Sequence, residues 1–282
     1  MYNAGLILEG GGMRGAYTAG VLDYFLDNDI EFSSCYGVSA GAGHCCSYVS
    51  KQKKRAITVS VSYLENKEYA SMHSLIKTGD YFGAKFIYKK IPSELNKFDH
   101  DTFNSYKGKF YASVTNCITG KAEYLLVKDS RKDMAKIVAS SSLPLLARVI
   151  MIGGKPYLDG GVSDSVPLVQ SEKDGNAKNV VILTRNAGYR KEANKFADVL
   201  KLKYRKYPEL IKAMKRRHIM YNSEMDYIEE QEEKGNVFVI RPTEKMDIGR
   251  LEKNKEKLLA LYEAGYKDAA ECGEKMLEYL EK

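Results

Sequence analysis

The first part of the chain alternates short apolar runs with glycine-rich turns and helical patterns. Residues 5–8 form an apolar run, and residues 15–28 then repeat apolar side chains at helical spacing. A second apolar run at 33–38 ends at Ser39, after which small residues lead into another helical stretch. This order of strand, turn, helix, strand, turn and helix predicts a parallel sheet with covering helices, and therefore an α/β fold.

The rest of the chain adds further strands and highly charged helices. Residues 109–116 and 121–127 are typical of a strand pair joined by a turn at Thr119-Gly120. The segment 54–108 predicts mixed helices with a loop at 98–101. The other predicted elements are a helix near 130–139 that Pro144 ends, strands at 180–184 and 237–240, and helices at about 199–233 and 251–280 with a break at Pro208.

A glycine-rich segment follows the first strand. Gly10, Gly11, Gly12, Arg14 and Gly15 lie between that strand and the next helix. Backbone N–H groups and the helix dipole point the same way there, and glycine permits close approach of another atom. The segment therefore predicts a site for negative charge.

The same segment matches the G-x-G-x-x-G pattern of dinucleotide-binding turns. That interpretation requires an acidic residue near the end of the second strand to hold the ribose. Here the second strand ends in Gly37-Val38-Ser39 instead. Nucleotide binding and a purely structural tight turn therefore stay as alternatives to the anion site.

A G-x-S-x-G sequence lies between the second strand and its following helix. Gly37 and Gly41 flank Ser39 so that a sharp turn is possible, and Ala40 opens the helix with its N–H beside the serine hydroxyl. A strand–turn–helix setting is the context that a nucleophile elbow requires. We therefore predict that Ser39 is a nucleophile.

A serine nucleophile needs a base within hydrogen-bond reach, and Asp159 is the candidate. An Asp-Gly pair on its own is typical of a turn. Here Gly160 and Gly161 follow Asp159, and such small neighbours let a carboxylate approach a serine without obstruction.

The charge of the chain gives a weaker indication of its partners. The net charge is +7, and many of the cations lie in the 201–217 stretch. Such a run is typical of a solvated helix face, and contact with an anionic membrane surface is the functional alternative. No recognition-helix, zinc or RNP-type motif indicates nucleic-acid binding.

Several features of the sequence favour a cytoplasmic location. Five irregularly spaced cysteines indicate reduced thiols. The N-terminus enters a strand at once, and no apolar run approaches the length of a membrane span. We therefore expect a cytoplasmic protein, with peripheral contact at the inner membrane face as the extension of the 201–217 hypothesis.

The three motifs in this order resemble the patatin-like phospholipase family. The resemblance rests on G-G-G-x-R-G at 10–15, G-x-S-x-G at 37–41 and D-G-G at 159–161, with a small-residue block ahead of a proline at 139–144. The charged C-terminal helices suggest its bacterial branch. Beyond about residue 190 the resemblance contributes little.

The resemblance implies a three-layer α/β/α fold with a mostly parallel sheet and a serine–aspartate dyad. Ser39 would attack the ester, Asp159 would take its proton, and residues 10–15 with Ala40 would supply an oxyanion hole that Arg14 supports. The implied substrates are acyl esters of lipids, with no metal and no cofactor. Residues 1–190 would be the catalytic domain, and 191–282 a charged helical region packed on the same core.

Two alternatives stay open. A Ser-His-Asp hydrolase needs a histidine after the acid, and only His218 follows Asp159, within a basic run expected to be solvated. His44 lies on the helix after the elbow and is expected to point away from the Ser39 hydroxyl. A lipid-binding protein of the same fold with gated or absent activity is the second alternative, against which the intact dyad argues.

Overall fold

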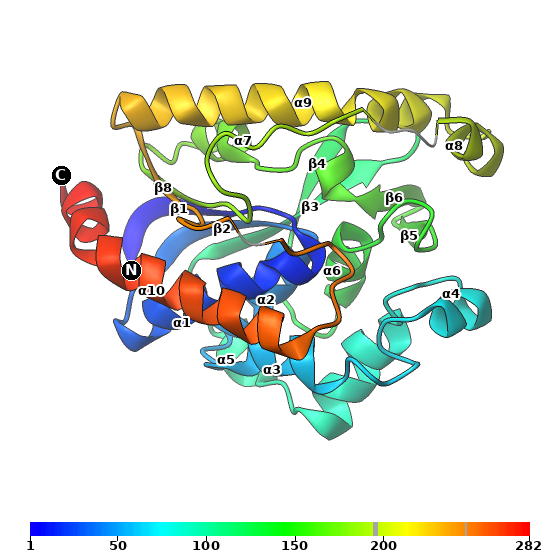
Figure 1. Ribbon diagram of the computed structural model, residues 1–282, viewed down its shortest axis with the longest axis horizontal. Coiled ribbons are helices and arrows are strands. Elements are labelled where there is room, and N and C mark those ends of the chain that lie inside the picture. Colours follow the sequence, from blue (N-terminus) through cyan, green and yellow to red (C-terminus); the bar gives the residue numbers. More distant parts are fainter. Residues whose placement is uncertain (194–196, 246) are drawn as a thin grey trace.

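The protein is built around an eight-stranded sheet (Figure 1). The computed structural model describes residues 1–193, 197–245 and 247–282. The strand order is β5-β6-β3-β2-β1-β7-β8, and β4 pairs with β3 beside this path. The strands are β1 (Tyr2–Leu8), β2 (Phe32–Val38), β3 (Lys109–Asn116), β4 (Ala122–Leu126), β5 (Ile150–Ile152), β6 (Lys155–Asp159), β7 (Asn179–Ile182) and β8 (Val237–Ile240).

Parallel pairing dominates the middle of the sheet. Strands β3, β2, β1, β7 and β8 run parallel to one another, whereas β4 and β6 run antiparallel to β3, and β5 runs antiparallel to β6. The predicted α/β fold with a mostly parallel sheet is therefore confirmed. The sequence analysis missed β5 and β6, because strands of three and five residues are too short to show a periodic pattern.

The helices also follow the predicted pattern with shifted ends. They are α1 (Ala16–Asp27), α2 (Ala40–Val49), α3 (Arg55–Ser62), α4 (Met72–Thr78), α5 (His100–Asn104), α6 (Met134–Ser140), α7 (Leu168–Lys173), α8 (Ala197–Lys203), α9 (Pro208–Glu233) and α10 (Lys255–Glu281). Two short 3₁₀ turns, η1 (Gly12–Gly15) and η3 (Gly160–Val162), and a π-helix, η2 (Phe86–Leu95), complete the set of described elements. Pro208 begins α9, which confirms the predicted break.

The predicted loop at 98–101 is in part wrong. Helix α5 begins at His100, and the Asp99 carboxylate accepts a hydrogen bond from the Thr102 N–H at 2.9 Å. Aspartate is a favoured residue at a helix N-cap because its side chain accepts from an otherwise unpaired N–H. The same pattern that marks a turn thus marks the start of a helix here.

Side chains of the central strands alternate between two apolar layers. In β1, Leu6 and Leu8 join the core under α1 and α10, and Ile7 joins the core under α7 and α9. This alternation follows from the two-residue period of a strand. Helices on both faces of a parallel sheet produce the three layers seen in Figure 1.

The last helix packs against the first. The Tyr17 hydroxyl donates to Asp268 at 2.8 Å, and the Tyr262 hydroxyl donates to Asp23 at 2.8 Å, so α1 and α10 exchange buried hydrogen bonds. A division near residue 190 stays a prediction, and residues 194–196 and 246 of the proposed C-terminal region lie outside the described residues. None of the helices in the described ranges is both long and apolar enough to span a bilayer.

Candidate active site

Ser39 occupies a strained turn between β2 and α2. Its backbone has φ 54° and ψ −120°, in the positive-φ region that non-glycine residues rarely adopt. The side chain is buried, and Ala40 begins the helix directly after it. The backbone therefore has the form of the predicted elbow, in which the helix N-terminus lies beside the serine.

Strand β3 brings Asp159 to the same place. Val38 of β2 is paired with Ser113 of β3, and the next residue, Val114, is paired with Asp159 of β6. Ser39 and Asp159, far apart in sequence, therefore lie at one end of adjacent strand pairs. The close packing depends on Gly160, because a Cβ there would lie 2.3 Å from the Ser113 carbonyl oxygen.

The two carboxylate oxygens of Asp159 have different surroundings. Oδ1 accepts a hydrogen bond from the Gly161 N–H at 2.8 Å. Oδ2 is buried and has no hydrogen-bond partner in the described part of the chain. Burial raises the pKa of the Asp159 carboxyl, while the Arg217 guanidinium and the Ser39 hydroxyl act to lower it.

The small-residue block after α6 contacts both candidate residues. The Ser39 N–H donates to the Ser140 hydroxyl at 3.0 Å, and the Asp159 N–H donates to the Ser142 carbonyl at 2.9 Å. The Ser141 hydroxyl donates to the Ser39 carbonyl at 3.3 Å. These bonds give the block a physical role, because they fix the backbone of Ser39 relative to that of Asp159.

The glycine-rich loop follows β1 at the same edge of the sheet, because β1 and β2 are parallel neighbours. Gly12 has φ 59°, and a Cβ there would lie 2.6 Å from the Arg250 carbonyl oxygen. That carbonyl accepts the Met13 N–H at 3.1 Å, so this N–H is already paired. The Gly11 N–H donates to no described residue.

The other predicted site residues surround these three segments. Arg14 is 5% exposed, and its Nε has no hydrogen-bond partner in the described residues. The remaining glycines make close backbone or side-chain approaches: Gly10 beside Ser39, Gly15 beside His44, Gly37 against Ala42, Gly41 against the Leu8 carbonyl, and Gly161 against Arg217. The motifs that are distant in sequence are thus brought together.

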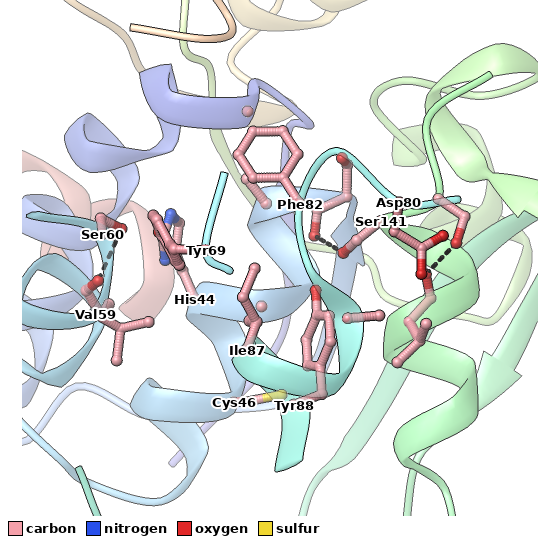
Figure 2. A pocket seen from close by; sticks show the side chains of 18 of the residues that line it. His44, Cys46, Val59, Ser60, Tyr69, Asp80, Phe82, Ile87, Tyr88 and Ser141 are labelled. Carbon is pink, nitrogen blue, oxygen red and sulfur yellow. Dashed lines mark hydrogen bonds between the residues drawn. The ribbon is translucent and has the colours of Figure 1, made fainter. Parts of the chain in front are cut away.

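An apolar cavity of about 170 Å³ adjoins Ser39. Its walls come from α2, α3, η2 and the segment after α6, and apolar side chains make up much of the lining. Ile87 and Tyr88 lie between His44 and Ser141 in the close view (Figure 2). A space of this kind next to a candidate nucleophile suits an acyl chain. We call it the acyl cavity.

The histidines do not form a triad in the described residues. His44 lines the acyl cavity, and burial lowers its pKa to about 4, so it is neutral. Neither His44 nor His218 has a hydrogen bond with Ser39 or Asp159 among the described residues. No group of three or more His, Cys, Asp or Glu side chains there is arranged to hold a metal ion.

The 201–217 stretch corrects one expectation. Its other cations are exposed, as a solvated helix face requires, but Arg217 turns inward and a Cβ on Gly161 would lie 3.0 Å from its Nη2. His218 is half-buried as well, and its Nδ1 is enclosed without a partner in the described residues. Both side chains point inward because α9 lies over η3, which carries Gly161.

Comparison with known proteins decides the family. A family model described as patatin-like phospholipase matches residues 6–170, more than half of the chain. The chain belongs to the patatin-like phospholipase family. A second model, a domain of unknown function (DUF6363), matches residues 207–281 of this patatin-like protein.

Two curated relatives share only part of their length with it. The uncharacterized protein YjjU of Escherichia coli K12 is 29% identical over 185 residues, which cover 64% of this chain and 51% of the relative. The probable lipid hydrolase 463L of invertebrate iridescent virus 6 is 23% identical over 192 residues, covering 63% and 66%. Among solved structures, VipD of Legionella pneumophila has a TM-score of 0.48 at 13% identity, covering 100% of this chain and 67% of that one.

Several residues around Ser39 and Asp159 of this patatin-like chain escaped the sequence analysis. Arg217 was expected at the surface, and nothing in the sequence marked Tyr88, whose pKa burial raises to about 12 beside Ser141. Arg250 lies in an irregular segment without a motif. The motif residues could be recognised in the sequence because they occur at a fixed spacing. These other side chains reach the site only through tertiary packing.

Proposed function

We propose that this patatin-like protein hydrolyses acyl esters of lipids with Ser39 as nucleophile and Asp159 as its base. The observation that carries the proposal is the unpaired Oδ2 of a buried aspartate next to a strained serine that lines an apolar cavity. Family membership and the viral relative named as a lipid hydrolase support the same reaction class.

In the first half of the reaction, the Ser39 Oγ attacks the acyl carbonyl and its proton passes to Asp159 Oδ2. The carbonyl oxygen becomes an oxyanion, for which the N–H groups of Gly11 and Ala40 are the available donors. Asp159 then returns the proton to the departing alcohol oxygen, and the acyl group stays on Ser39 as an ester.

In the second half, water replaces the alcohol. Asp159 takes a proton from the water while the water oxygen attacks the carbonyl carbon of the acyl-enzyme. The proton then passes to the Ser39 Oγ as the fatty acid leaves. The Gly161 N–H holds Oδ1 throughout, so Oδ2 keeps one orientation. Serine and aspartate are thus restored after each turnover.

A fluorophosphonate probe tests the nucleophile directly. The Ser39 Oγ should displace fluoride from phosphorus, so mass spectrometry should find the label on the Ser39 peptide at near one equivalent. Ser39→Ala should abolish labelling. Ser60→Ala is the matched control, because the Ser60 hydroxyl lines the same cavity but donates to the Ala56 carbonyl at 2.9 Å.

The outcome separates an enzyme from a binding protein. Labelling that survives Ser39→Ala would place the nucleophile elsewhere. A folded wild type that does not label at all would favour the gated or non-catalytic lipid-binding alternative over hydrolysis.

We also propose that the protein is cytoplasmic and contacts anionic membranes with the outer face of the 201–217 stretch. Lys203, Arg205 and Lys206 are exposed there, beside Leu202 with 79% of its side chain exposed. Exposed cations next to an apolar side chain suit a phospholipid surface. Replacing these three cations by glutamate should remove salt-sensitive sedimentation with phosphatidylglycerol vesicles. Unchanged sedimentation would leave a merely solvated helix.

A further inference from the structure

Five cations gather next to the proposed dyad without acidic partners. They are Arg14, Arg185, Lys191, Arg217 and Arg250, and we call them the cationic cluster. In the described part of the chain, none of their side chains forms an ion pair or donates a hydrogen bond. The Nε atoms of Arg14, Arg185 and Arg217 are buried without any partner in the described residues.

Shared neighbours bring these cations together, because Arg185 and Lys191 both lie over the Tyr189 ring and Arg217 and Arg250 line one cavity. Burial lowers the pKa of Arg14 to about 10, assisted by Arg185 and Arg250. Burial lowers the pKa of Lys191 to about 7, assisted by Arg217, Arg250 and Arg14. A buried charge without a counter-charge is unfavourable, so a protein that keeps several of them together is suited to bind an anion.

The nearby acids neutralise the cluster only in part, and Glu9 acts to raise the pKa values of Arg14, Lys191 and Arg217. Both Glu9 oxygens already accept hydrogen bonds, from the Thr184 N–H and hydroxyl and from the Tyr221 hydroxyl. Burial and the neighbouring Asp164 raise the pKa of Glu224 well above its usual range. Asp159 adds one charge on the side of the dyad.

Aromatic rings support two of the cations and leave their donors free. The Arg185 guanidinium lies 4.3 Å from the centroid of the Tyr189 ring, and the Lys191 ammonium lies 4.1 Å from that of Tyr221. Such contacts fix a cation in place without using its N–H groups. The cluster is therefore both organised and unsatisfied.

A second cavity gives an anion access to the cluster. It has a volume of about 250 Å³, and Arg217 and Arg250 are the charged side chains in its wall. The rest of the wall is mainly apolar, and Leu143 and Leu146 line both this cavity and the acyl cavity. A ligand that joins an anion to an acyl ester could thus occupy both spaces, with its acyl part in the cavity that Ser39 lines.

We propose that the cationic cluster is a subsite for the phosphate of a phospholipid substrate, bound by Arg217 and Arg250 across residues 143–146 from the acyl chain. The proposal rests on the lipid hydrolase function proposed above. It gives the C-terminal region, which supplies both arginines, a part in choosing the substrate. A guanidinium offers several N–H donors in a plane that matches phosphate oxygens.

The test compares two lipids that differ only in phosphate. Wild type should hydrolyse dihexanoyl phosphatidic acid with a kcat/KM about 10- to 100-fold above that for dihexanoylglycerol, because charged hydrogen bonds of this kind contribute such factors. Arg250→Gln should lower this ratio about 10-fold or more. Both arginines act to lower the pKa of Asp159, and Arg250 is preferred to Arg217 here because its effect on that pKa is the smaller of the two.

A matched control removes one arginine outside the cluster. Arg190 lies next to Lys191 in sequence but is exposed and paired with Asp226 and Glu229, each at 2.9 Å. Arg190→Gln should leave the ratio between the two lipids unchanged. Thermal unfolding of both variants checks that the fold is intact.

Binding to the Ser39→Ala variant separates this proposal from the proposed reaction. By calorimetry, phosphatidic acid should bind more tightly than dihexanoylglycerol and more tightly than inorganic phosphate, and Arg250→Gln should remove the difference. Such binding without turnover by wild type would sustain the subsite and overturn hydrolysis. Turnover of both lipids at equal kcat/KM would support hydrolysis and overturn the phosphate subsite. Equal affinity for inorganic phosphate and phosphatidic acid would mean a free-phosphate site and overturn the lipid assignment.

Discussion

Ser39→Ala is expected to reduce hydrolysis of p-nitrophenyl butyrate by at least about 1,000-fold, because no other group would carry the acyl intermediate. Asp159→Asn should lower kcat by about 100- to 10,000-fold, since the amide cannot accept the serine proton. Asn keeps the size of the side chain, and its Oδ1 can still accept the Gly161 N–H. The loss would therefore report proton transfer more than packing.

The measurement is the initial rate with purified protein, alongside Ser60→Ala as a control on the same cavity. Turnover within a few fold of wild type in Asp159→Asn would show that this carboxylate is not the base. Turnover that persists in Ser39→Ala would show that the elbow is not the site of attack.

The pH profile supplies a second test of the same base. The carboxylate must be ionised to accept a proton, so activity should fall as the pH drops through the raised pKa of Asp159. Arg217 acts to lower that pKa, and Arg217→Gln should therefore move the acidic limb of kcat/KM to higher pH. The neighbouring exposed Arg216→Gln is the control. An acidic limb that does not move would show that Arg217 does not influence the pKa of the base.

Gly265→Ala is expected to destabilise the protein by about 2 to 3 kcal/mol, although alanine normally favours a helix by about 1 kcal/mol over glycine. A Cβ on Gly265 would lie 2.1 Å from the carbonyl oxygen of Tyr17, and one on Gly20 would lie 2.0 Å from that of Tyr262. Helices α1 and α10 thus touch backbone to backbone at two reciprocal glycines. Neither backbone can shift without moving its helix.

Gly43→Ala is the matched control for this prediction. Gly43 is also a helical glycine, but a Cβ there meets nothing within 4 Å. The Gly43→Ala substitution should raise the free energy of unfolding by about 0.5 to 1 kcal/mol. Urea unfolding of both variants gives the comparison. A Gly265→Ala protein as stable as wild type would mean that α1 and α10 pack less closely than described.

Local patterns were enough to predict the opening of the fold. The apolar run before Gly10 and the helical spacing after Gly15 are properties of neighbouring residues, and α1 follows them within one residue. β6 could not be predicted in this way, because its five residues are stabilised by pairing with β3 across the sheet. Its position brings Asp159 beside Ser39, so the sequence alone could only suggest that meeting.

The surroundings of the candidate site depend on contacts that no local pattern encodes. Arg217 lies in a run of cations whose other members are exposed, and only the packing of α9 over Gly161 turns it inward. Arg250 contributes a backbone carbonyl to the Met13 N–H, which any residue type could supply. The Arg250 side chain joins the cationic cluster only in the folded protein.

The bond between the Arg250 carbonyl and the Met13 N–H has a consequence for how such chains are divided in genome surveys. The signature motifs all end by Gly161. The glycine-rich loop that carries the first of them nevertheless contacts the backbone of Arg250, far beyond the last motif. The cooperative unit is therefore longer than the signature. A fragment trimmed to its motifs would contain the whole signature and still lack the Arg250 carbonyl that binds its glycine-rich loop.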